Sequence, residues 1–75
     1  MTIKKFSECL IDDFTCYVDG YHVGIFPGLN GPGYWATDSD AHECVCYRTL
    51  EELLDNFKVG GRSWREVVLD VTDYN

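Results

Sequence analysis

The stretch FTCYVDGYHVGIF, residues Phe14–Phe26, decides the fold. Asp19-Gly20 divides it into two β-prone runs, and this dipeptide is typical of a two-residue hairpin turn because both of its positions need a positive φ. Alternate positions on both sides of the turn are apolar: Phe14, Cys16, Val18, Val23 and Ile25. The alternation predicts a β-hairpin with one face toward a core.

Two further strands are expected after this hairpin. The segment PGLNGPG, residues 27–33, is rich in turn-forming residues. It has no lysine and matches neither the P-loop nor the dinucleotide-binding pattern, so we interpret it as a flexible connection between strands. GYWAT predicts a third strand, and AHECVCYR a fourth with Cys44 and Cys46 on one face. Between them, DSDA predicts a turn.

Helical spacing of apolar residues appears on both sides of the strand region. TIKKFSECLI predicts a helix over about residues 3–11 capped by Thr2, with a first strand as the alternative. Thr49 opens a capping box for a helix over about 50–58 that Gly60-Gly61 would stop. Ser63 opens a second capping box, for a helix over about 64–70 that places Trp64 in the core. The tail TDYN is polar, and we expect it to fray.

These elements predict an α+β fold in one domain, residues 1–75. It consists of a small antiparallel sheet of three to four strands, with an N-terminal helix and two short C-terminal helices packed on it. A chain of 75 residues can build one small core but no deep active site.

The charge of the chain excludes some partners. Thirteen acidic residues against six basic ones give a net charge of −7, which argues against direct binding of nucleic acid or anionic membranes. No apolar run approaches the ~20 residues of a membrane span. The N-terminal MTIKKFSECL lacks the apolar segment of a secretion signal, so we expect an intracellular protein. Its four cysteines are then expected to be free thiols, with disulfides as the alternative.

The segment TDSDAHECVC, residues 37–46, gathers side chains that could carry chemistry. Counted from Asp38 as a calcium loop, it fails at the fifth, sixth and twelfth positions. Cys44 and Cys46 are separated by a single residue, which does not match the usual spacing of zinc ligands. A His42–Cys44 contact is conceivable, but no group that would orient the histidine is evident. We therefore predict no enzyme, no cofactor and no metal, and interpret this segment as an exposed acidic turn.

Aromatic residues lie on both sides of this turn. Tyr34 and Trp35 are neighbours on the third strand, so their side chains point to opposite faces and one of them is expected to be exposed. Aromatic rings beside charge form a typical recognition surface. The expected partner-binding residues are Tyr34, Trp35, Asp38, Asp40, Glu43, Asp12, Asp13 and Asp19. A second acidic cluster, Glu51, Glu52 and Asp55, is more simply a solvated helix face.

The segment TLEELLDNFKVGGRSWREVV, residues 49–68, resembles the ending of many small proteins from bacteriophages and mobile elements of Gram-positive bacteria. Such proteins include anti-CRISPR and other anti-defence inhibitors. The resemblance implies an inhibitor in the cytoplasm of a bacterial host cell, whose carboxylates would occupy a basic, nucleic-acid-binding groove of an immune effector. The alternatives are an oligomeric sponge for a nucleotide signal, using GLNGPG and Trp35, and an accessory protein of a mobile element.

Overall fold

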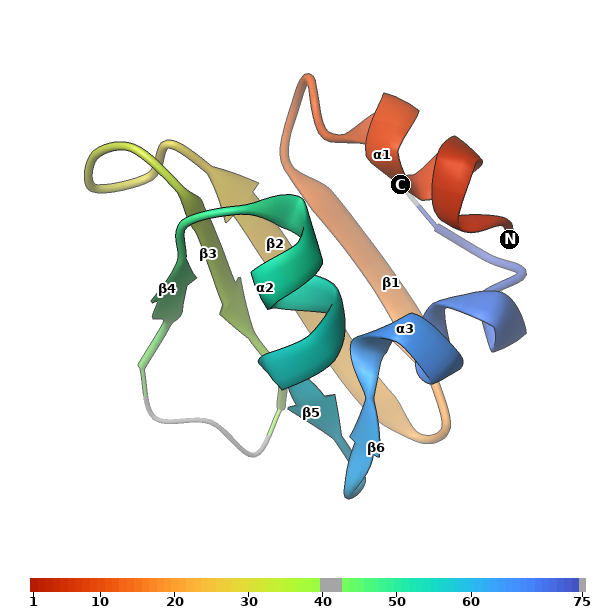
Figure 1. Ribbon diagram of the computed structural model, residues 1–75. Coiled ribbons are helices and arrows are strands. Elements are labelled where there is room, and N and C mark those ends of the chain that lie inside the picture. The colour runs from red at the N-terminus through yellow and green to blue at the C-terminus, as the bar shows by residue number, and fades with distance from the viewer. Residues whose placement is uncertain (40–42, 75) are drawn as a thin grey trace.

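The computed structural model describes residues 1–39 and 43–74, and it confirms the α+β fold. Four antiparallel strands form one sheet in chain order: β1 (Phe14–Val18), β2 (Tyr21–Pro27), β3 (Tyr34–Thr37) and β4 (Val45–Tyr47) (Figure 1). The helices are α1 (Ile3–Cys9), α2 (Leu50–Asn56) and α3 (Trp64–Val67), which continues as a 3₁₀ turn, η1 (Val68–Asp70). The N-terminal element is thus a helix and not a strand.

The predicted hairpin around Asp19-Gly20 is confirmed. Asp19 and Gly20 adopt φ values of 53° and 82°, as a two-residue turn of this twist requires. Val18 pairs with Tyr21, so Tyr17 lies opposite His22 on the next strand. Side chains of β1 alternate between buried and accessible positions. The turn therefore fixes which residues of both strands face the core.

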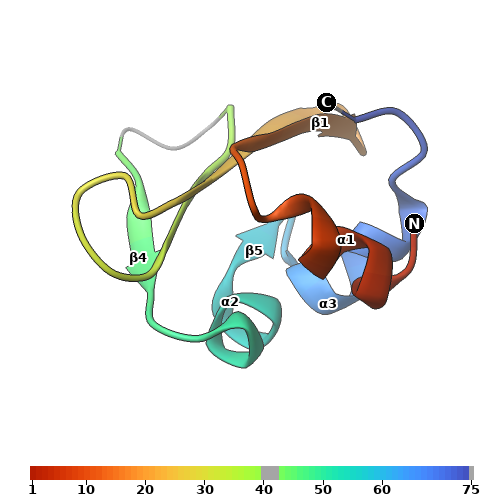
Figure 2. The same cartoon turned by 90° about the horizontal axis from the view of Figure 1, so that it is seen from above.

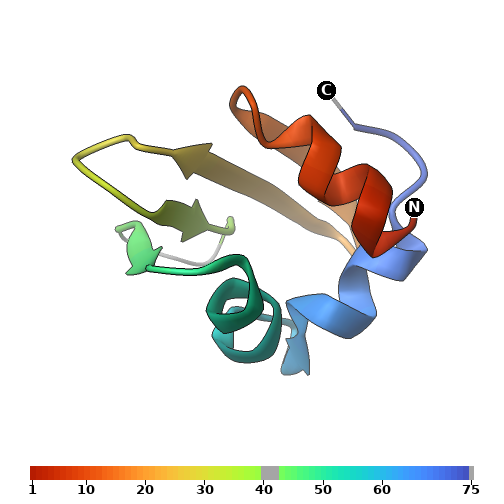
Figure 3. The ribbon, with the colours of Figure 1, turned by 45° about the horizontal axis from the view of Figure 1, so that its top comes forward.

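All three helices cover the same face of the sheet (Figures 2 and 3). Phe6 from α1, Phe14 from β1 and Trp64 from α3 meet in edge-to-face contacts, with ring centroids 5.1–6.4 Å apart. These rings and the neighbouring aliphatic residues are almost completely buried. The core thus joins the N-terminal helix, the sheet and the C-terminal helix.

The two expected capping boxes have different outcomes. Thr49 caps α2, since its hydroxyl accepts a 3.1 Å hydrogen bond from the backbone N–H of Glu52. Ser63 occupies the N-cap position of α3, but its side chain makes no capping hydrogen bond, so the second box is wrong. The helix predicted over 64–70 is present as α3 followed by the tighter η1.

The expected role of Gly60-Gly61 is also wrong. The helix α2 ends at Asn56, before these glycines. They form the turn of a second small hairpin, with φ values of 60° and 84°, between β5 (Lys58–Val59) and β6 (Arg62–Ser63). This hairpin reverses the chain and places α3 beside α2.

In the C-terminal tail, Tyr74 is held against the sheet, so the expectation that this segment frays is wrong for Tyr74. Tyr74 forms a β-bridge with Cys16, and its ring stacks on Phe14 with centroids 5.8 Å apart. The tail therefore lies along the free edge of β1. Tyr74 remains 40% exposed, but its stacking on the buried ring of Phe14 provides a favourable contact that the polar composition of this segment did not indicate.

The fourth strand is shorter than the eight residues expected, since β4 contains only Val45–Tyr47. The turn predicted at DSDA, residues 38–41, falls partly outside the described residues, because residues 40–42 are not described. The candidate residues Asp40 and His42 therefore also lie outside the described residues. All four cysteines are unpaired thiols, as expected. Over residues 1–39 and 43–74, no helix has the length and apolar character of a transmembrane segment.

Candidate functional site

The face of the sheet opposite the helices is the candidate site. We call it the outer face. The strand register and the side-chain alternation place eight residues on it: Thr15, Tyr17, His22, Gly24, Phe26, Trp35, Thr37 and Cys46. None of the strands β1 to β4 contains an aspartate, glutamate, lysine or arginine. The outer face is therefore an uncharged surface with four aromatic rings.

Tyr17 and His22 form the most exposed part of this face. They lie directly opposite each other on β1 and β2, and their rings stack in parallel at 4.7 Å with an interplanar angle of 3°. Such cross-strand pairs stabilise a sheet locally. Tyr17 remains 66% exposed. The stack thus holds a flat aromatic surface toward solvent in a fixed orientation.

Phe26 and Trp35 form a second aromatic pair farther along the face. They are partners in the β2–β3 register, and both are half-buried. Phe26 lies over Gly24, because a Cβ at that glycine would come within 2.6 Å of the ring. The indole N–H of Trp35 donates a 3.3 Å hydrogen bond to the carbonyl of Gly31. Backbone and side-chain contacts therefore hold both rings against the sheet.

The sequence predicted that either Tyr34 or Trp35 would be exposed, and the structure shows that neither is. Their side chains do point to opposite faces, but both are half-buried. Tyr34 lies on the side of the sheet that the helices cover. There it packs against the buried core cluster, which includes Phe57. Only Trp35 of this predicted pair belongs to the outer face.

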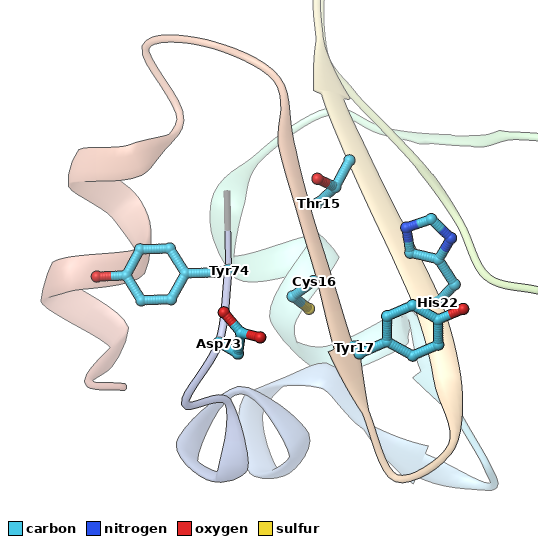
Figure 4. A pocket seen from close by; sticks show the side chains of 6 residues that line it. All are labelled: Thr15, Cys16, Tyr17, His22, Asp73 and Tyr74. Atoms are coloured by element: carbon cyan, nitrogen blue, oxygen red, sulfur yellow. The ribbon is translucent and has the colours of Figure 1, made fainter.

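A cavity of about 190 Å³ lies at the edge of the outer face, between β1 and the C-terminal tail (Figure 4). It is lined by Thr15, Cys16, Tyr17, His22, Asp73 and Tyr74. Burial raises the pKa of the Cys16 thiol to about 11, so this sulfur is protonated near neutral pH. The thiol therefore lacks the low pKa that a nucleophilic cysteine needs.

The predicted carboxylates lie at opposite ends of the sheet. Asp12 and Asp13 are exposed in the turn before β1, whereas Asp19 lies in the turn after it. Asp38 follows β3 at the same end as Asp19, where the hydroxyl of the adjacent Ser39 accepts a hydrogen bond from the backbone of His22. The strand β1 spans about 17 Å between these ends. The carboxylates thus border the outer face and do not form one patch, and Glu43 is exposed before β4.

Two arginines offset part of the negative charge on the helical side. Arg62 lies 3.1 Å from carboxylate oxygens of both Asp19 and Asp70. Arg65 pairs with Glu51 and, at 2.8 Å, with Asp55. The hydrogen bond from Arg65 lowers the pKa of Asp55. The acidic cluster on α2 is therefore partly neutralised by Arg65. Asp19 is paired with Arg62 in the same way, and this pairing makes Asp19 less available to a partner.

Sequence reasoning missed several residues of the outer face. The Asp-Gly turn fixes the register of its hairpin, so the opposition of Tyr17 and His22 could have been predicted from it. The same alternation places Phe26 on their face. Asp73 had no such signal, because its position depends on the contact of the neighbouring Tyr74 with the core.

Among the described residues, no group of three histidine, cysteine or carboxylate side chains is placed to hold a metal ion. The potential ligand His42 lies outside the described residues. No protein-family model matches the chain, and comparisons with curated proteins and with solved structures find no match.

Proposed function

We propose that this protein is a non-enzymatic binding protein whose outer face docks on a basic surface of a protein partner. The observation that carries the proposal is an uncharged aromatic sheet face, bordered by carboxylates, on the side of the sheet opposite α1, α2 and α3 (Figure 2). The resemblance of residues 49–68 to phage and mobile-element proteins supports the proposal that this activity belongs to the anti-defence class. The partner would then be a bacterial immune effector in the host cytoplasm.

The composition of the outer face fits a protein interface. The centres of such interfaces are depleted in charge and enriched in aromatic residues, whereas their rims are polar. Tyr17 and Trp35 belong to the residue types that contribute most to binding energy. Their orientations are fixed by the stack with His22 and by the hydrogen bond to Gly31. Docking would therefore cost little side-chain entropy.

The charge at the rim favours a basic partner. Asp12, Asp13, Asp38 and Glu43 lie around the sheet, and the molecule carries a net charge of −7. Carboxylates at a rim accelerate encounter with a positive surface and discriminate against acidic ones. A surface built for nucleic acid is rich in lysine and arginine. An acidic protein that covers it would prevent the nucleic acid from binding, which is a direct route to inhibition.

Reversing the exposed rim carboxylates should weaken this association. The double variant Asp12→Lys/Asp13→Lys adds two charges at each position, so the net charge changes from −7 to −3. We expect the tagged wild type to retain a nucleic-acid-binding protein from bacterial lysate at about 0.1 M salt, and to lose it at about 0.5 M because the rim charges are screened. The variant should retain less than the wild type at the lower salt.

A control variant separates rim position from total charge. Glu8→Lys/Glu52→Lys makes the same charge change at exposed positions of α1 and α2, on the helical side. We expect it to capture more partner than the Asp12/Asp13 variant. Equal losses in the two variants would show that only net charge matters. Retention of no partner by the folded wild type would refute the proposed function.

A further inference from the structure

The cavity beside β1 has the size of a site for one side chain. Its volume is about 190 Å³, below the roughly 300–1,000 Å³ of typical small-molecule sites. Figure 4 shows it between the strand and the tail, with Tyr17 and His22 on one side and Asp73 on the other. It opens at the border of the outer face. A partner docked on that face could therefore extend one side chain into it.

The lining combines a flat aromatic surface with a carboxylate. The Tyr17–His22 stack provides the aromatic surface, and the Tyr17 ring is largely exposed. Asp73 provides the carboxylate, which makes no hydrogen bond or ion pair with any residue in the ranges 1–39 and 43–74. Thr15 adds a hydroxyl group. An aromatic ring and a free carboxylate together favour a cation.

Among side-chain cations, the guanidinium group fits this lining better than an ammonium group. It is planar, so it can stack on a tyrosine ring while its N–H groups form paired hydrogen bonds to a carboxylate. The two arginines on the helical side are already paired with carboxylates of this chain. We propose that the cavity formed by Thr15, Tyr17, His22 and Asp73 binds an arginine side chain of the protein partner. This proposal rests on the proposed function, and it specifies the partner's chemistry.

The test uses N-acetyl-argininamide as the probe and N-acetyl-citrullinamide as its neutral isostere. Each is titrated into ¹⁵N-labelled protein while amide chemical shifts are followed. We expect saturable shifts at Thr15, Tyr17, His22 and Asp73 with the arginine probe. The citrulline probe should bind at least about fivefold more weakly, because it cannot form the charge-assisted hydrogen bonds. Equal affinity for the two probes, or the absence of saturable shifts at these residues, would overturn the proposal.

Two variants with a matched control locate the site. Asp73→Asn should weaken binding of the arginine probe at least about fivefold, whereas Glu8→Gln, with the same loss of charge at an exposed position of α1, should change it less than about twofold. Tyr17→Leu removes the flat ring and should also weaken binding. Spectra of the free variants report whether they are folded. Equal effects of Asp73→Asn and Glu8→Gln would overturn the proposal.

Failure of the arginine site can be distinguished from failure of the proposed function. If the arginine probe does not bind but the wild type captures a salt-sensitive partner, the docking proposal is supported and the arginine site is wrong. If the probe binds in the cavity and no partner is captured, the cavity has the proposed chemistry and the proposed function is wrong.

Discussion

Replacing Trp64 with alanine is expected to lower the free energy of unfolding by about 3–5 kcal/mol. The side chain is completely buried, and its ring contacts Phe6, Phe14 and Phe57 at centroid distances of 5.5, 6.4 and 5.8 Å. A domain of 75 residues has about 4–11 kcal/mol of stability in total. The substitution would therefore remove a large part of that stability, because it leaves a cavity where helix, sheet and hairpin meet.

The measurement is urea unfolding followed by far-ultraviolet circular dichroism. We expect the midpoint of Trp64→Ala to fall by at least about 1 M. Trp35→Ala is the matched control, since it removes the other tryptophan from the outer face, where the ring is only half-buried. It should change the midpoint much less. Similar midpoints for the two variants would contradict the assignment of Trp64 to the centre of the core.

Replacing Gly33 with alanine is expected to destabilise the pairing of β3 with β4. The glycine has a φ of 118°, a conformation that costs other residues about 1–3 kcal/mol. A Cβ there would also lie 2.7 Å from the Cys46 sulfur and 2.9 Å from the backbone oxygen of Tyr47. The oxygen belongs to the neighbouring strand, so it cannot move away without shifting β4. The alanine thus adds steric overlap to backbone strain.

Gly31→Ala is the control for this prediction. Gly31 also has a positive φ, of 131°, but a Cβ there would have no neighbouring atom within 4 Å. This variant reports backbone strain alone. We expect Gly33→Ala to be the less stable of the two in thermal unfolding, with faster amide exchange in Val45–Tyr47. Equal stabilities and equal exchange would show that β4 tolerates the added methyl group.

Local patterns in the sequence were sufficient for much of the fold. The Asp19-Gly20 turn and the alternation around it predicted the central hairpin, because both depend only on neighbouring residues. The apolar stripe containing Leu53 and Leu54 predicted a helix, and both leucines are buried. The threonine cap at Thr49 followed the same local rule.

Features that depend on tertiary contacts were not predicted. Gly60-Gly61 can end a helix or turn a hairpin, and the choice depends on the packing of Val59 and Trp64 into the core. The polar tail gave no indication that Tyr74 would stack on Phe14. For the same reason, Asp73 was not recognised as part of a cavity. Asp12, Asp13, Asp19 and Glu43 are exposed, but the division of the described carboxylates between two ends of the sheet required the topology.

The most direct test of the docking face compares two exposed residues on opposite sides of the molecule. Tyr17, on the outer face, is 66% exposed, and Leu69, on η1, is 57% exposed. With a captured partner, we expect Tyr17→Ser to weaken affinity at least about tenfold, as loss of an interface anchor does, and Leu69→Ser to change it less than about twofold. Weaker binding by Leu69→Ser, with Tyr17→Ser unchanged, would place the partner on the helical side and contradict the central claim.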